Sequence, residues 1–106
     1  MENQHRKIKG YRELCQEEID LMNRIKEKGK EILLLQKQLE ARLSTDFEHK
    51  QAEALRTQAG PNDFSSDEYA EFNRFIAAEP QRWAEIGKTN IELGVMALVR
   101  AVAQPA

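Results

Sequence analysis

The sequence predicts an all-α protein in which a short N-terminal helix precedes a long antiparallel helical hairpin, and the chains assemble into a homo-oligomeric helical bundle. Apolar residues recur in steps of three and four along most of the chain, which is the spacing of one face of an α-helix. Only five glycines and three prolines occur among 106 residues, so few positions break a helix. With 32% charged residues, the chain is expected to be one domain, residues 1–106, without a large core of its own.

A basic segment, His5–Tyr11, lies near the start of the chain and ends in an aromatic ring. Gly10 interrupts any helix that begins at Asn3, so the short N-terminal helix is expected to end there. Cations attract phosphates, and a flat ring stacks on a base. The segment therefore predicts a small ligand that carries both phosphates and a base.

The longest periodic segment predicts a helix from Gln16 to about Leu43. Cys15 stands at the N-cap position and Glu18 at the third helical position, as in a capping box. The expected core stripe consists of Met22, Ile25, Gly29, Ile32, Gln36, Leu39 and Leu43. Residues 44–58 remain helix-compatible but carry few apolar side chains, so we expect them to project from the body as a helical extension or to fray.

Two further helices are expected after a break at residues 59–63. Ser65 and Glu68 form a second capping box ahead of a short helix whose aromatic residues share one face. Pro80 starts the last helix, which extends to about Val102. The signals divide the single domain into an N-terminal segment with the long helix, a variable helical extension with a loop, and a C-terminal interface helix: residues 1–43, 44–79 and 80–106.

The last helix is apolar on nearly every side from Ile91 to Val102. Such a helix must be buried on every side, and one partner helix of the same chain cannot surround it, so neighbouring subunits are expected to cover it. The stretch is too short for the roughly 20 apolar residues of a membrane span, so no membrane insertion is expected. Earlier in the same helix, the size and spacing of Trp83 predict a core anchor.

The composition argues against several functional classes. A formal net charge of -2 disfavours binding to DNA or RNA polymers, which requires a basic surface. One cysteine cannot form an intrachain disulfide, and no secretory signal is recognisable, so a cytoplasmic protein is expected. No spacing of histidines, cysteines or carboxylates matches a metal site or a catalytic constellation, and no glycine-rich phosphate loop occurs. We therefore expect no cofactor, no metal and no enzymatic activity.

Two cations stand at positions that could serve binding. Lys26 directly follows the core position Ile25, so its ammonium group could face a groove between subunits, although a solvated charged face is the commoner arrangement. Arg82 lies in the first turn of the last helix, where its charge opposes the helix macrodipole. An anion held at that helix N-terminus explains Arg82 about as well as a simple surface position does.

Three blocks of the chain match one known pattern: Asn-Gln-His-Arg-Lys-Ile-Lys-Gly-Tyr-Arg-Glu-Leu at residues 3–14, Gln-Glu-Glu-Ile-Asp-Leu-Met-Asn-Arg-Ile-Lys at residues 16–26, and Arg82-Trp83 together with Met-Ala-Leu-Val-Arg-Ala-Val-Ala-Gln-Pro at residues 96–105. In these blocks the chain resembles the bacteriophage anti-CBASS sponge family, which blocks the host's cyclic-oligonucleotide immune signalling. The resemblance covers both ends of the chain, and residues 31–79 carry no matching motif.

The resemblance implies a compact helical protomer that forms a homohexamer in the cytoplasm of the infected bacterial host. Cyclic dinucleotides such as 3'3'-cGAMP would be held between protomers and not cleaved, so that CBASS immunity stays off. The resemblance assigns Tyr11 to stacking on a base and Lys26 to pairing with phosphates. It assigns Lys28 and Arg82 to a second pocket for cyclic trinucleotides, although a small hydroxyl residue is expected at the position of Lys28.

Two other hypotheses fit the residues. One is a non-enzymatic helical oligomer that acts as an adaptor or as a structural phage protein. The other is a weak nucleic-acid binder that uses the basic N-terminal segment, and steep salt dependence would distinguish it.

Overall fold

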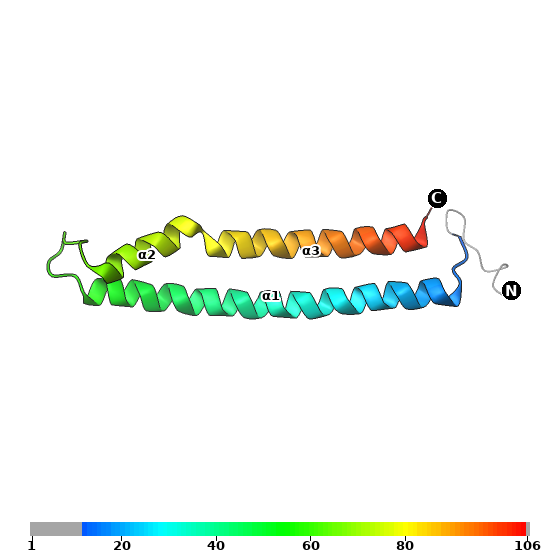
Figure 1. The fold of residues 1–106 in the computed structure, drawn as a ribbon, viewed down its shortest axis with the longest axis horizontal. Helices are drawn as coiled ribbons and strands as arrows, with labels where there is room; N and C mark the ends of the chain where they lie inside the picture. The colour runs from blue at the N-terminus through cyan, green and yellow to red at the C-terminus, as the bar shows by residue number, and fades with distance from the viewer. Residues whose placement is uncertain (1–11, 106) are drawn as a thin grey trace. The chain divides into compact units, whose positions relative to one another are not determined.

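The computed structural model describes residues 12–105, and these residues form three α-helices and no strand (Figure 1). Helix α1 is Gln16–Arg56, α2 is Asp67–Ala78 and α3 is Pro80–Ala103. The all-α prediction is confirmed for this part of the chain. The expected short N-terminal helix lies outside the described residues. No helix within residues 12–105 is long and apolar enough to cross a membrane.

The helices form two compact units. The first unit consists of α1 up to Leu34 and α3 from Lys88, and the second unit is Leu35–Gly87. In the first unit, Arg12 contacts Ala103 while Gly29 lies against Val95, so α1 and α3 run in opposite directions there. This arrangement agrees with the predicted antiparallel hairpin within that unit.

Helix α1 begins where the capping pattern predicts. The backbone N–H of Cys15 donates to Oε1 of Glu18 at 3.0 Å, which is the reciprocal half of a capping box. The carbonyl of Cys15 accepts from the N–H of Ile19 at 3.0 Å. The start of the long helix at Gln16 is therefore confirmed.

Helix α1 does not end near Leu43, so that predicted boundary is wrong, but the expected helical extension after it is confirmed as far as Arg56. It continues to Arg56 and packs on α2, with the rings of Phe47 and Phe72 edge to face at a centroid distance of 5.6 Å. Ala54 is only 1% exposed, and Lys50 forms an ion pair with Glu71 at 3.0 Å. Few apolar side chains are enough here because Leu43, Phe47 and Ala54 still fall on one face of the helix.

The packed stripe of α1 agrees with the predicted one at Gly29 and Gln36, which are both buried. It differs at Ile32 and Leu39, which are each 47% exposed, and the neighbouring Leu33 is half-buried instead. The amide Nε2 of Gln36 donates to the carbonyl of Ala84 at 2.9 Å and to Glu40 at 2.8 Å, which satisfies this buried polar group. The stripe that contacts α3 and α2 is narrow, so the chain leaves several large apolar side chains of α1 in the open.

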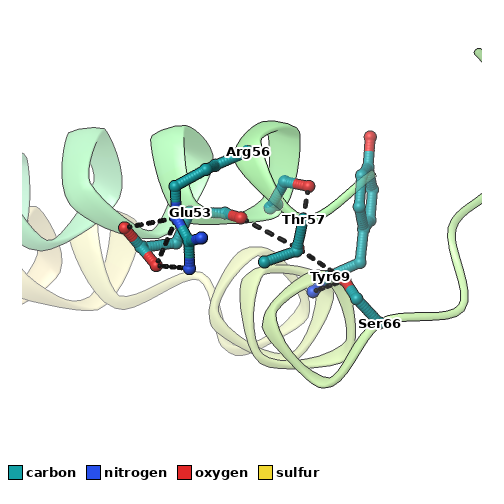
Figure 2. Close-up of polar contacts among 6 residues, drawn as sticks. Glu53, Arg56, Thr57, Ser66 and Tyr69 are labelled. Atoms are coloured by element: carbon teal, nitrogen blue, oxygen red, sulfur yellow. Dashed lines mark hydrogen bonds and ion pairs between the residues drawn. The ribbon is translucent and has the colours of Figure 1, made fainter. Parts of the chain in front are cut away.

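Helix α2 begins one residue later than its predicted capping box. Its N-cap is Ser66, whose Oγ accepts from the N–H of Tyr69 at 3.0 Å and lies 2.8 Å from Oγ1 of Thr57 (Figure 2). Ser65 instead donates its N–H and its hydroxyl to Oδ1 of Asp63, at 3.1 and 2.6 Å. The Asp63 carboxylate therefore engages Ser65 in a local turn, and the cap falls on the next serine.

Helix α3 begins at Pro80, as predicted. The residue before it, Glu79, ends α2 in a left-handed conformation with φ of 50°, and its N–H donates to the carbonyl of Ile76 at 3.1 Å. Its carbonyl accepts from the N–H of Trp83 at 3.2 Å. Glu79 thus ends α2 and caps the start of α3, so a single residue connects the two helices.

Candidate functional site

The candidate site is built around a close contact between α1 and α3 in the first unit. Gly29 is buried, and a Cβ atom added there would lie 2.6 Å from Cγ2 of Val95. Only glycine allows the two helices to approach this closely without displacing Val95. The contact separates two open grooves, one on each side of it, and Gly29 and Val95 line both.

One groove contains the predicted phosphate-binding lysine, and we call it the Lys26 groove. Its volume is about 480 Å³. Its lining residues are Lys26, Gly29, Lys30, Leu33, Glu92, Val95 and Met96. The volume lies within the range of roughly 300–1,000 Å³ that is usual for small-molecule sites, which are mostly apolar with a few polar groups.

The other groove contains the second predicted lysine, and we call it the Lys28 groove. Its volume is about 410 Å³. Its lining residues are Leu21, Arg24, Ile25, Lys28, Gly29, Ile32, Val95 and Leu98. The structure therefore places Lys26 and Lys28 in different grooves, although they are two residues apart. The resemblance also assigned them to two different pockets.

The cations of the two grooves differ in their surroundings. Lys28 forms an exposed ion pair with Glu31 at 3.5 Å. Among residues 12–105, no carboxylate lies within 4.0 Å of the Lys26 or Lys30 ammonium group. Glu92 lines the Lys26 groove from α3 without closing on either lysine. The charged groups of this groove therefore leave space for a ligand between them.

The remaining predicted site residues lie elsewhere. Tyr11 lies outside the described residues. Arg82 belongs to the second unit, where it pairs with Glu79 at 3.3 Å and its guanidinium lies 5.3 Å from the ring centre of Trp83. Trp83 is 58% exposed, so its predicted role as a core anchor is wrong. The bulk of its ring surface is open, and the arginine covers one part of it.

Comparison with known proteins gives a clear relationship. No family model matches the chain. Anti-CBASS protein 2 of Pseudomonas phage JBD67 is 62% identical to it over 105 residues, which cover 99% of this chain and 97% of that protein. The chain belongs to the anti-CBASS protein 2 family. The family resemblance that the terminal blocks indicated is confirmed, and the alignment extends through residues 31–79, where no motif was recognisable.

Arg12 joins the chain ahead of α1 to the end of α3, a contact that the sequence did not reveal. Its guanidinium donates to the carbonyls of Val102 and Ala103, at 2.7 and 3.1 Å, and so satisfies the C-terminal end of α3. It also pairs with Glu18 at 2.6 Å. These contacts tie the start of the described chain to the end of α3 within the first unit.

The same contact shifts a carboxyl pKa. The hydrogen bond from Arg12, together with the backbone N–H of Cys15, lowers the pKa of Glu18 from 4.5 to about 2. Glu18 is therefore ionised at every physiological pH, and the anchor persists across that range. The only sequence signal for it is the capping position of Glu18, which does not name Arg12 as a partner.

No metal centre competes with the grooves as the candidate site of this anti-CBASS protein 2 family member. Within residues 12–105, no group of three or more His, Cys, Asp or Glu side chains is placed to hold a metal ion. His49 and Lys50 line a further groove, in the second unit, together with four carboxylates, and Lys50 is already paired there. The cationic grooves of the first unit are the more distinctive feature.

Proposed function

We propose that this chain suppresses CBASS antiphage immunity by binding cyclic oligonucleotide second messengers and holding them without cleavage. The relative from Pseudomonas phage JBD67 carries an anti-CBASS name, and family membership supports the same role here. The observation that carries the proposal is the Lys26 groove, where two ammonium groups and apolar walls share a volume of about 480 Å³. Such a groove can hold a ligand that combines phosphates with flat bases.

Each candidate residue has one role in this proposal. Lys26 pairs with phosphate oxygens of a cyclic dinucleotide such as 3'3'-cGAMP, and Tyr11 stacks on one of its bases. Lys28, in the neighbouring groove, and Arg82, in the second unit, are proposed to serve cyclic trinucleotides. Lysine can meet phosphate as a point charge, so Lys28 is compatible with that ligand class. Binding and release require no bond to break, so we propose no catalytic residue and no cofactor.

The proposed active form is a homo-oligomer, and the family resemblance implies a hexamer. Large apolar side chains remain exposed on α3 in the isolated chain, including Leu93, Met96 and Leu98. Large apolar side chains that gather on one helix and stay exposed on more than one side of it are typical of a helix covered by other subunits. We therefore propose that neighbouring subunits cover this part of α3 and complete the grooves, and that the assembly acts inside the infected bacterium.

Isothermal titration with 3'3'-cGAMP tests the proposal directly. The wild-type chain should bind saturably, and the ligand recovered by chromatography should be intact. Lys26→Ala should weaken binding by about tenfold to a hundredfold, because a charge-assisted hydrogen bond contributes roughly 1.5–3 kcal/mol. Lys37→Ala is the matched control, because Lys37 is an exposed lysine of α1 that lines neither groove.

Two results would reject the proposal in favour of other functions. Absence of any heat with cyclic di- and trinucleotides, with oligomerisation intact, would support a structural or adaptor role for the exposed apolar surface. Binding to linear oligonucleotides with steep salt dependence and no preference for cyclic ligands would support a nucleic-acid binder.

A further inference from the structure

Lys30 occupies a position in the Lys26 groove that the family pattern does not explain. It lies four residues after Lys26, so both side chains leave α1 on the same side, with Cβ atoms about 5–6 Å apart. Both line the same groove. We infer that Lys30 is a second phosphate-binding cation of this groove, which selects ligands with two phosphates over ligands with one. The inference rests on the proposed function, because it presupposes that the groove binds cyclic nucleotides.

The other cations near the groove are already engaged or face elsewhere. Lys28 pairs with Glu31, and both Lys28 and Arg24 line the opposite groove. Among the described residues, Lys30 has no carboxylate within ion-pair distance. A lysine side chain kept apart from carboxylates is free to pair with a ligand anion instead.

The charge balance of the groove explains why one lysine is not enough to attract an anion. Glu92 contributes a negative charge from α3, so Lys26 and Glu92 alone would leave the groove formally neutral. Lys30 brings the formal charge of the lining to +1. Unit charges at groove distances interact by about 1–4 kcal/mol, depending on exposure, so this change from a neutral to a positive lining decides whether an anion is attracted.

The ligand class follows from these positions. A cyclic dinucleotide carries two phosphodiesters, and two cations one helical turn apart can engage one phosphodiester each. A cyclic mononucleotide carries one phosphate and gains less from the second lysine. The groove is therefore suited to cyclic dinucleotides, and Lys30 accounts for part of the preference.

The test compares Lys30→Ala and Lys30→Arg with the wild-type chain and with Lys37→Ala, by titration with 3'3'-cGAMP at several salt concentrations. Lys30→Ala should weaken binding by about tenfold, and the slope of log affinity against log salt should become shallower, because one ion pair that salt screens is lost. Lys30→Arg should retain binding because the charge remains. Lys37→Ala should match the wild type in both affinity and slope. Cyclic GMP should bind more weakly, with little effect of Lys30→Ala.

The outcomes separate this inference from the proposed function. If the wild type binds 3'3'-cGAMP and Lys30→Ala leaves the affinity and the salt slope unchanged, Lys30 is a solvated surface lysine and the inference is wrong. If the wild type binds no cyclic nucleotide, the proposed function fails and the inference falls with it. Circular dichroism and light scattering on each variant establish that fold and assembly are unaltered, so a change in affinity reports on the ligand contact.

Discussion

The two units of the chain differ in how many of their lysines and arginines form ion pairs. In the second unit, Arg42, Lys50, Arg56, Arg74 and Arg82 all form ion pairs with carboxylates of the same unit. Figure 2 shows one of them, with Arg56 held by Glu53. In the described part of the first unit, Lys26 and Lys30 line a groove without such a partner. A cation held apart from carboxylates can bind an anion without breaking an ion pair, so we propose that the cyclic dinucleotide binds in the first unit.

The two units also differ in how they pack. The second unit encloses aromatic rings, with Phe75 only 6% exposed and Phe47 within 6.5 Å of it between ring centres. The first unit has its closest contact at a glycine and a valine, and large aliphatic side chains around them stay exposed. The second unit thus supplies the buried apolar residues of the described chain, and we propose that partner subunits cover the first unit. Three substitutions, each with a matched variant, test this contrast.

The largest expected effect is loss of assembly in Leu98→Asp. Leu98 is 56% exposed in the isolated chain and lies in the apolar half of α3, so a charge there would be buried without a partner in an oligomer. Light scattering should show a smaller particle. Leu55→Asp makes the same change at a leucine of the second unit that is 57% exposed, and it should leave the mass unchanged. Equal behaviour of the two variants would remove the distinction between the units.

The next effect is a loss of stability without loss of binding in Phe75→Ala. Truncation of a buried phenylalanine costs about 3 kcal/mol of unfolding free energy, because burial and contacts with Phe47 are both lost. Urea denaturation should show a lower midpoint, while the affinity of the folded protein for 3'3'-cGAMP should stay near the wild-type value. Phe64→Ala, at a ring that is 55% exposed, should cost much less. A large loss of affinity in Phe75→Ala would show that the units are not separable.

The smallest effect concerns acid stability. Hydrogen bonds from Arg74 and then from Lys50 lower the pKa of Glu71 from 4.5 to about 2. A carboxylate with a depressed folded-state pKa stabilises the fold above its unfolded value, and that contribution is lost as the pH falls from about 4.5 towards 2. Glu71→Gln should therefore flatten the acid side of the stability curve and lower stability slightly at neutral pH. The effect is modest because the pair is partly exposed.

A matched variant, Glu18→Gln, measures the acid response of the first unit for comparison with that of the second. Glu18 has its pKa lowered to about 2 by Arg12, so Glu18→Gln should flatten the same pH range. Thermal unfolding between pH 2 and pH 7 measures both variants. A wild-type curve that stays flat below pH 4.5 would contradict the contribution of these two carboxylates.

Much of the fold could be predicted because short-range signals agree with it. Glu18 marks the start of α1, and Pro80 marks the start of α3. The register of the packed stripe was harder to predict. Ile32 and Leu33 are both apolar, and only the position of the facing helix determines that Leu33 is the more buried of the two. Trp83 illustrates the same limit, since size and spacing favour burial but the facing surface leaves its ring exposed.

The candidate site was predictable only in part. The family pattern pointed to Lys26 and Lys28, and the structure adds that a glycine contact places them in separate grooves. The anchoring role of Arg12 depends on the end of α3, about ninety positions away in the sequence, which no local pattern connects to it. Lys30 and Glu92 likewise come together only through the packing of α1 on α3.

The Gly29–Val95 contact has a consequence for how the two grooves respond to ligands. Because both grooves share these two residues as a wall, they are not independent volumes. A ligand that pushes Val95 aside in one groove reshapes the other, and the two binding free energies are then linked. Such linkage is reciprocal: whatever factor the first ligand imposes on the second, the second imposes on the first.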